Sequence, residues 1–249
     1  MTGLARQIAV LAAIAFNLTL NALAGAGVLF GVQTGAVSDS IQTGVTPAGW
    51  AFSIWSVIFL GAMVTGIWQA RPSARGARYD ALAAPLIAAN VLNGLWQIPW
   101  SLRLFGVAAV VIVGILASLA WLYVRLDRMQ MTRAERWTLG VPVSLWFAWL
   151  CVATPLNITI ALAAAGWTGG AIWPPLLVVV VAAVGVALLR NTGDVAFAGV
   201  LLWAYLAIWA QNGAGDPLLT GALAASAAAF VLSAGLAIRG GASPLPVVR

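Results

Sequence analysis

The chain has 249 residues, among which there is no His, no Lys and a single Cys, and only 7% are charged. Without His, the commonest metal ligand and general base is missing, and without Lys no Schiff base can hold a cofactor. One cysteine, Cys151, excludes internal disulfides, cysteine-type zinc sites and iron–sulfur clusters. Soluble domains carry about 25% charged residues. The shortage of charge therefore excludes a soluble globular protein.

The chain has apolar residues in their place: 63% are hydrophobic, and 13 are Trp. A helix needs about 20 mostly apolar residues to cross a bilayer. Eight stretches meet this requirement, separated by polar or Pro- and Gly-rich breaks. We predict an all-α integral membrane protein with eight transmembrane helices, at about residues 7–31, 50–70, 81–101, 104–124, 137–163, 173–189, 195–212 and 217–238.

The arginines support this count. With eight spans, eleven of the twelve basic residues fall on one side of the membrane, and only Arg103 falls on the other. Such an asymmetry marks the cytoplasmic side, so we expect both termini in the cytoplasm. The net charge of +6 is then a topology marker, and we expect a lipid bilayer and no nucleic acid as partner. The absence of Lys and the abundance of Ala and Arg favour a bacterial cytoplasmic membrane.

The first stretch has a competing interpretation. Arg6, an apolar run and Ala22-Leu-Ala24 resemble a signal peptide with its cleavage site, and cleavage would leave seven spans. Asn17 and Asn21 interrupt the run, however, and the apolar stretch continues to Phe30. We therefore expect the first stretch to be a membrane span.

All six acidic residues lie at span ends or in connections, and we expect none of them to be buried. Proton relays and ion-coupled carriers usually depend on intramembrane carboxylates, so a pump is disfavoured. Without His, Lys or a buried acid, conventional acid–base catalysis lacks its usual residues. We expect a protein that is not an enzyme and that requires no cofactor and no metal.

Amide side chains supply the polarity inside the spans. Asn21 lies four residues after Asn17, and Asn93 shares one helical face with Asn90 and Gln97, while Asn157 stands alone in the fifth span. Such residues serve either as hydrogen bonds between helices or as donors into a pocket. The residues alone leave both interpretations open.

The tryptophans form two groups. Five lie near span ends, as in an interfacial belt. Others lie deeper, and those of spans two and three fall in the same membrane half as Asn21, Asn93 and Asn157. The connection of residues 31–49, on that side, is long enough for a lid. We expect either a pocket for a flat hydrophobic ligand or a core filled with aromatic rings.

Three motifs resemble the TspO/MBR family, the tryptophan-rich sensory or translocator proteins. They are Pro47-Ala-Gly-Trp50-Ala-Phe52-Ser-Ile-Trp55, Asn93-Gly-Leu-Trp96, and Pro142-Val-Ser-Leu-Trp146 followed by Leu156-Asn157. The resemblance covers about residues 5–163. About three additional residues separate Trp146 from Asn157, so the counterpart of the family's tryptophan is Trp146 or Trp149.

The resemblance implies a five-helix bundle over residues 1–165, which residues 166–249 enlarge by three helices and a short tail. It also implies binding of porphyrins or other tetrapyrroles, or of sterol- and lipid-like molecules, and a homodimer. We predict a membrane receptor or sensor for a flat hydrophobic ligand; the alternatives are a transporter of a small hydrophobic solute or lipid and a porphyrin-degrading enzyme. The predicted ligand-binding residues are Asn21, Trp50, Phe52, Trp55, Asn93, Trp96, Trp100, Trp146, Trp149 and Asn157.

Overall fold

The computed structural model describes residues 3–239, in which eight helices are long and apolar enough to cross a membrane. The predicted all-α class and the number of spans are confirmed; Arg249, counted above, lies outside the described residues. The helices are α1 (Gly3–Gly25), α2 (Thr34–Asp39), α3 (Ile54–Gln69), α4 (Ala77–Ser101), α5 (Phe105–Asp127), α6 (Arg133–Glu135), α7 (Val141–Ala164), α8 (Trp173–Thr192), α9 (Val195–Asn212) and α10 (Pro217–Arg239). A 3₁₀ turn, Gly49–Ser53, leads into α3, and a π-helical turn, Arg136–Gly140, joins α6 to α7.

The first helix ends six residues before the predicted limit. Gly27 adopts a φ of 72°, which a residue without a Cβ takes at little cost. The amide of Val28 then donates to the carbonyl of Leu23, and the amide of Gly27 donates to that of Ala24. This is the Schellman pattern that closes a helix, so the apolar residues up to Phe30 belong to the connection.

The turn between α8 and α9 follows its local sequence. Gly193 ends α8 with a φ of 71°, and the Asp194 carboxylate accepts a hydrogen bond of 2.9 Å from the amide of Phe197 at the start of α9. A left-handed glycine followed by an aspartate cap is the expected way to end one helix and begin the next.

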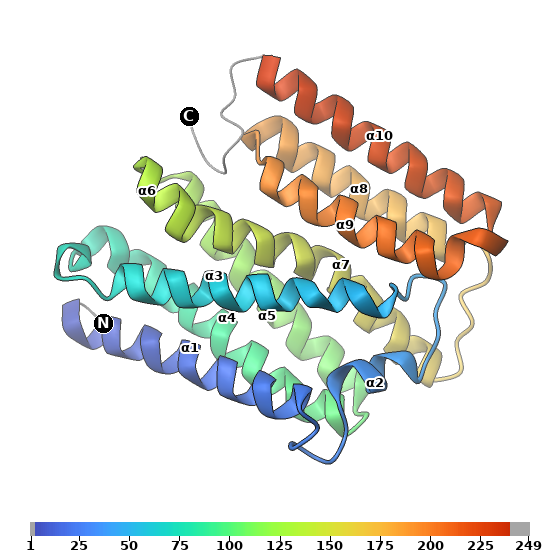
Figure 1. Ribbon diagram of the computed structural model, residues 1–249, viewed down its shortest axis with the longest axis horizontal. Coiled ribbons are helices and arrows are strands. Elements are labelled where there is room, and N and C mark those ends of the chain that lie inside the picture. The colour runs from blue at the N-terminus through green and yellow to red at the C-terminus, as the bar shows by residue number, and fades with distance from the viewer. Residues whose placement is uncertain (1–2, 240–249) are drawn as a thin grey trace.

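Helix α7 is the most buried span and lies at the centre of the molecule. It packs against α3 and α5 on one side and against α9 on another, while α4 packs between α1 and α5. Helices α8, α9 and α10 pack against one another and form the upper part of Figure 1. The division of the chain near residue 165 stays a prediction. Helix α9 packs against α7, so the two predicted parts are in contact.

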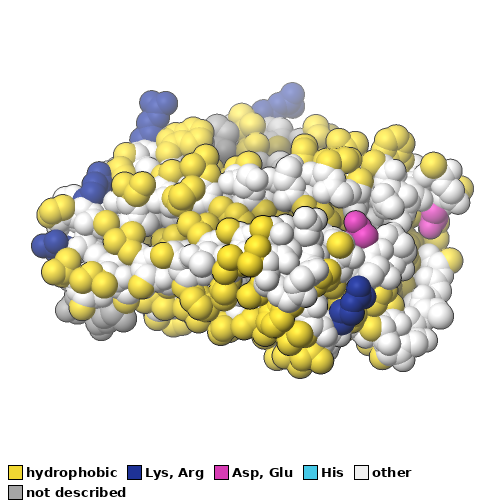
Figure 2. Space-filling view, turned by 60° about the horizontal axis from the view of Figure 1, so that its bottom comes forward, with side chains coloured by type: hydrophobic (Ala, Val, Ile, Leu, Met, Phe, Trp, Pro, Cys, Tyr) yellow, Lys and Arg dark blue, Asp and Glu magenta, His cyan; other side chains and the backbone are white. Residues whose placement is uncertain are grey.

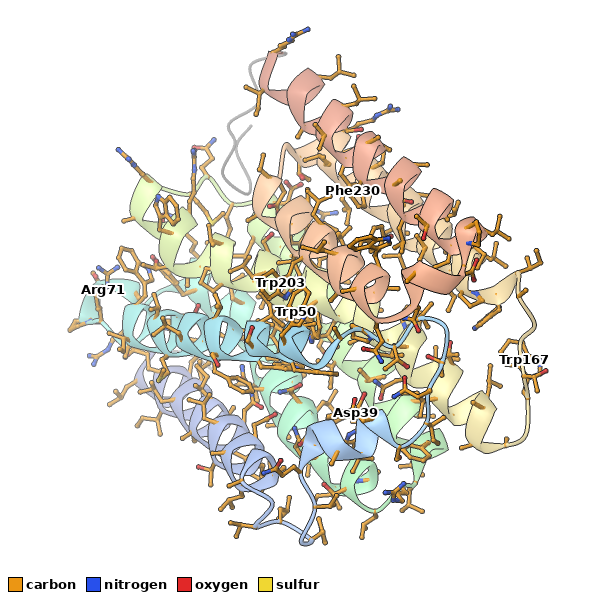
Figure 3. The ribbon with its side chains drawn as sticks, turned by 45° about the vertical axis from the view of Figure 1, so that its right-hand side comes forward. Asp39, Trp50, Arg71, Trp167, Trp203 and Phe230 are labelled. Atoms are coloured by element: carbon orange, nitrogen blue, oxygen red, sulfur yellow. The ribbon has the colours of Figure 1, made fainter. Side chains whose placement is uncertain are left out.

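The two ends of the bundle differ in charge. At the end that we call the arginine end, Arg6 pairs with Asp80 at 3.1 Å and Arg78 pairs with Glu135 at 3.1 Å. At the opposite end, the loop end, the connection of residues 31–49 meets Arg103, which donates to Ser40 at 2.8 Å. Figure 3 shows Arg71 at the arginine end, and Asp39 and Trp167 lie toward the loop end. This separation agrees with the arginine distribution along the chain.

The outer surface is apolar. Large side chains such as Ile67, Val110 and Leu232 are more than half exposed, and hydrophobic groups cover much of the face in Figure 2. Exposing such a surface to water is unfavourable, whereas exposing it to the hydrocarbon of a bilayer is not. The chain is thus a multi-pass integral membrane protein.

The expectation of no buried acid is wrong. Asp194 is fully buried and Glu135 is nearly so. Asp194 accepts hydrogen bonds from Tyr123 and Ser144 in addition to its helix-capping bond, and Glu135 accepts from Tyr79 at 2.6 Å. Both acids cap helices at the arginine end, where packed neighbours supply the donors that water would otherwise provide.

Candidate functional site

A cavity of about 250 Å³ lies inside the bundle at the loop end. Its wall comes from five spanning helices and from the connection between α1 and α3. Its lining residues are Asn21, Gly25, Thr34, Gly35, Ser38, Pro47, Phe52, Trp55, Phe59, Asn93, Trp96, Gln97, Trp100, Ile112, Trp149, Leu150, Val152, Ala153, Leu156 and Asn157.

Aromatic rings form much of this wall. Trp55 and Phe59 stack on α3 with their centroids 5.3 Å apart, and Trp96 and Trp100 stack on α4 at 4.8 Å. Trp149 of α7 meets Trp55 edge to face at 6.4 Å. Rings that stack in pairs along a helix hold one another in place, so the cavity is bounded by fixed flat surfaces.

Amide side chains join α1 to α4 along one side of the cavity. Asn17, which is fully buried, donates to Asn90 and accepts from Asn21 and Asn93, with distances of 2.8 to 3.0 Å. Gln97 extends the chain by donating to the Asn21 oxygen at 2.6 Å. The two interpretations of the amides thus apply to different residues: Asn17 and Asn90 join helices, whereas Asn21, Asn93 and Gln97 also line the cavity.

The indole groups differ in how their N–H is satisfied. The N–H of Trp96 donates to the Asn157 oxygen at 3.1 Å, which ties α4 to α7 across the cavity. The N–H of Trp149 is buried and has no hydrogen-bond partner among the described residues. A buried donor without an acceptor costs about 1–3 kcal/mol. The Trp149 ring borders the cavity, but its indole nitrogen is buried and is not exposed to it.

The connection between α1 and α3 closes the cavity. The Thr34 hydroxyl donates to the Gln97 oxygen at 2.9 Å, and the Trp100 indole donates to the Thr34 carbonyl at 3.1 Å. Gly35, Ser38 and Pro47 face the cavity from this segment. The predicted position of this connection over the aromatic residues agrees with the structure.

Eight of the ten predicted site residues line the cavity, and Trp50 and Trp146 do not. Trp50 lies in the 3₁₀ turn, in which residues three apart share a face. Phe52 and Trp55 share the cavity side, so Trp50 is directed away from it and packs on Trp203 of α9 with the centroids 4.6 Å apart (Figure 3). That contact could not be read from the motif.

Trp146 is buried about one helical turn nearer the arginine end than Trp149. Trp149 borders the cavity together with Asn157, which lies about two helical turns further along α7 toward the loop end. Trp149 therefore borders the cavity and Trp146 does not; which of the two corresponds to the family's tryptophan stays a prediction.

Several cavity residues were missed. Gln97 and Phe59 had a detectable signal, because each lies four residues after a predicted site residue, Asn93 and Trp55, on the same helical face. Pro47 and Leu156 belong to the first and third motifs but were not named as site residues. Thr34 and Ser38 had no signal of their own, since their position depends on how the connection folds over the helices. Val152 is an ordinary apolar residue of α7, and nothing in its spacing separates it from core.

The cavity is electrically neutral, since none of its lining residues is ionisable. Within residues 3–239 no group of three His, Cys, Asp or Glu side chains could hold a metal ion. Asp194 lies far from this cavity, at the arginine end, and its burial raises the pKa of its carboxyl group against the opposing effect of its hydrogen bonds. The site therefore offers stacking, dispersion and a few amide hydrogen bonds.

Comparison with known proteins gave one match. A family model described as TSPO-like protein matches residues 7–237, which extends past the three motifs through α8 and α9 and most of α10. No curated protein and no solved structure matches the chain.

Proposed function

Because this chain belongs to the TSPO-like protein family, we propose that it is a membrane receptor or sensor that binds a flat hydrophobic ligand, and that the ligand is a porphyrin or a related tetrapyrrole. The observation that carries the proposal is the aromatic cavity at the loop end. Its wall is mostly apolar, and its polar side chains are four amides and the hydroxyl residues Thr34 and Ser38, besides the indoles of its tryptophans. Such pockets gain affinity from the apolar ligand surface that they bury, and a few polar contacts orient the ligand.

The shape of the wall supports a planar ligand. The stacked pair on α3 and the stacked pair on α4 both border the cavity, and Trp149 stands edge-on to Trp55. A planar π-system between such rings gains about 0.5–1.5 kcal/mol for each aromatic pair in addition to the area that it buries.

The size of the cavity sets a condition on binding. About 250 Å³ is below the usual range of drug-sized pockets, roughly 300–1,000 Å³. A whole tetrapyrrole exceeds this volume. The proposal therefore includes an opening movement of the connection over the cavity, which is the only part of the wall outside the spanning helices.

The test is a titration of the purified protein in detergent with protoporphyrin IX, followed by porphyrin absorption and by quenching of tryptophan fluorescence. We expect saturable binding by the wild type. Trp149→Ala should weaken it about 3- to 10-fold, because one aromatic contact worth 0.5–1.5 kcal/mol is lost. Trp96→Phe should also weaken it, since it breaks the bond to Asn157.

Trp121→Phe is the matched control, because Trp121 is 47% exposed on α5 and does not line the cavity. It should bind as the wild type does. Trp146→Phe should also leave the affinity within about twofold. Absence of saturable binding in the wild type, or equal losses in the cavity variants and the control, would contradict the proposal.

The two alternative functions find less support. A transporter needs a path between the two ends of the bundle. On α1, α3, α4 and α5 the cavity residues lie in the half next to the loop end, and on α7 they extend from near its middle toward the same end. A porphyrin-degrading enzyme with acid–base chemistry needs an ionisable group near the ligand, and the cavity wall has none. Both features favour binding.

A further inference from the structure

The connection between α1 and α3 is held by two different parts of the molecule. Its first half, residues 31–40, contains α2 and contacts helix α4. Its second half, residues 41–53, runs past α8 and α9 before it enters α3. The two halves cover the same cavity, but their attachments have no residue in common.

The first half is attached through the cavity wall itself. Gln97 and Trp100 hold Thr34 by two hydrogen bonds, and both also line the cavity. A third bond, from Arg103 to Ser40, is exposed and is therefore weak. A ligand that contacts Gln97 or Trp100 thus acts directly on the residues that hold this half in place.

The hydrogen bonds of the second half go to a helix that does not border the cavity, although its Phe52 ring also packs edge to face on Trp149 of the cavity wall with the centroids 6.1 Å apart. The Asn212 side chain donates to the Thr46 carbonyl at 2.8 Å, and the Trp203 indole donates to the Ala51 carbonyl at 3.2 Å. The amide of Ala48 donates to the Ala207 carbonyl at 3.0 Å. All three attachments come from α9.

Packing strengthens these attachments. The Trp50 ring lies edge-on to Trp203, as the labelled pair in Figure 3 shows. Gly44 lies so close to Pro174 of α8 that a Cβ at this position would collide with the proline ring. The second half is thereby joined to α8 and α9 by side-chain packing as well as by hydrogen bonds.

The first half begins at residues that suit a hinge. Gly27, Phe30 and Gly31 have φ values of 72°, 64° and 69°, and the two glycines take such values readily. Phe30 does not, because a residue with a Cβ is disfavoured there. A few residues of this kind at the end of an element commonly absorb the rotation of a moving segment.

We infer that α9, with α8, fixes the second half of the connection as a rigid wall of the cavity, and that only residues 31–40 swing open to admit a ligand. Asn212 and Trp203 are then positioning residues for Pro47 and Phe52, which line the cavity from the fixed half. The three additional helices would thus define which side of the cavity opens. The inference rests on the proposed function only in taking this cavity as the binding site.

Hydrogen–deuterium exchange of the full chain without ligand tests the inference first. In the wild type, peptides from residues 31–40 should exchange faster than peptides from residues 41–53. Asn212→Ala and Trp203→Phe should each speed exchange in 41–53 by roughly fivefold, the effect of one lost hydrogen bond, and leave 31–40 unchanged. Thr34→Val should speed exchange in residues 31–40 and leave exchange in residues 41–53 unchanged.

Trp209→Phe is the matched control for Trp203→Phe. It makes the same substitution on the same helix, at a ring that is 49% exposed and does not contact the connection through any hydrogen bond. Its exchange should equal that of the wild type. Equal exchange of the two halves in the wild type, or a rise in both halves when α9 alone is altered, would overturn the inference.

Stopped-flow binding of protoporphyrin IX gives a second measurement. Thr34→Val should raise the association rate constant several-fold, because it frees the swinging half. Asn212→Ala should leave association within about twofold and raise the dissociation rate constant. If protoporphyrin does not bind at all, the proposed function fails while the exchange result still decides whether α9 fixes half of the connection.

Discussion

At the scale of single residues, Asn17 and Asp194 show how this chain buries polar groups at low cost. Asn17 is fully buried, and its amide makes bonds with three other asparagines. Asp194 is fully buried, with three donors around its two oxygens. In each case the neighbours replace the hydrogen bonds of water, which is the condition for burying such groups.

The two residues differ in charge, and only Asp194 should make stability depend on pH. Burial raises the pKa of its carboxyl group above the ordinary value of the unfolded chain. The folded state therefore holds the proton more tightly, so this group's contribution to stability is largest at low pH. It declines as the pH rises from the ordinary value to the raised one.

We expect Asp194→Asn to remove this dependence. Asn still caps α9 by accepting from the Phe197 amide, and the hydroxyls of Tyr123 and Ser144 accept as well as donate. Melting temperatures in detergent between about pH 4 and pH 7 should show the wild type losing stability relative to the variant as the pH rises. A constant difference across this range would refute the assignment.

At the scale of elements, close helix contact decides how α8, α9 and α10 pack. Gly185 of α8 faces Leu201 of α9 and the Phe230 ring of α10 (labelled in Figure 3), and a Cβ there would collide with both. Small residues let membrane helices approach closely where no hydrophobic effect drives them together. The three-helix group therefore depends on this glycine.

A pair of matched substitutions tests that dependence. Gly185→Ala should destabilise the protein by about 1–3 kcal/mol, as an overpacked core does. Gly221→Ala, on α10, meets no atom within 4 Å and should be neutral or stabilise the protein by up to about 1 kcal/mol through helix propensity. Thermal unfolding in detergent compares the two variants, and equal effects would show that the contact at Gly185 is unimportant.

At the scale of the whole molecule, the arrangement of charge orients the bundle. Arg6 of α1 and Arg78 of α4 meet acidic partners of α4 and α6 at the arginine end, and the loop end carries Arg103 among the described basic residues. By the positive-inside rule we expect the arginine end in the cytoplasm. The proposed binding cavity then opens toward the opposite, outer side of what we propose is a bacterial cytoplasmic membrane.

Labelling of intact cells with a membrane-impermeant maleimide measures this orientation. In a Cys151→Ala background, Thr168→Cys in the exposed connection between α7 and α8 should react. Ser73→Cys, exposed between α3 and α4, should react only after the cells are lysed. The opposite pattern would place the termini outside, and labelling of both positions in intact cells would contradict the eight-span topology.

The homodimer implied by the family resemblance belongs to this scale too, and it stays a proposal. Among the described residues, shallow apolar grooves run between α8 and α10 and between α9 and α10 on the lipid-facing side. Lipid chains suit such grooves as well as a second copy does. Size measurement in detergent at several protein concentrations would establish the oligomeric state.

The sequence by itself determined the class, the eight spans and much of the cavity wall. Length and hydropathy are sufficient for a membrane helix, because the bilayer requires each span to satisfy its own backbone hydrogen bonds. Helical spacing then placed Asn93, Trp96 and Trp100 on one face, and all three line the cavity. Hydropathy and helical spacing depend only on residues close together in the chain, so the sequence is sufficient to predict them.

Only the tertiary structure decided the rest. Trp50 turns to α9 because a partner 153 residues later in the chain, Trp203, is there to receive it, and Trp149 rather than Trp146 borders the cavity because of helix depth. Asp194 is buried because Tyr123 and Ser144, from two other helices, supply donors. Each outcome depends on contacts between distant segments, and a side chain's environment is set by those contacts and not by its neighbours in sequence.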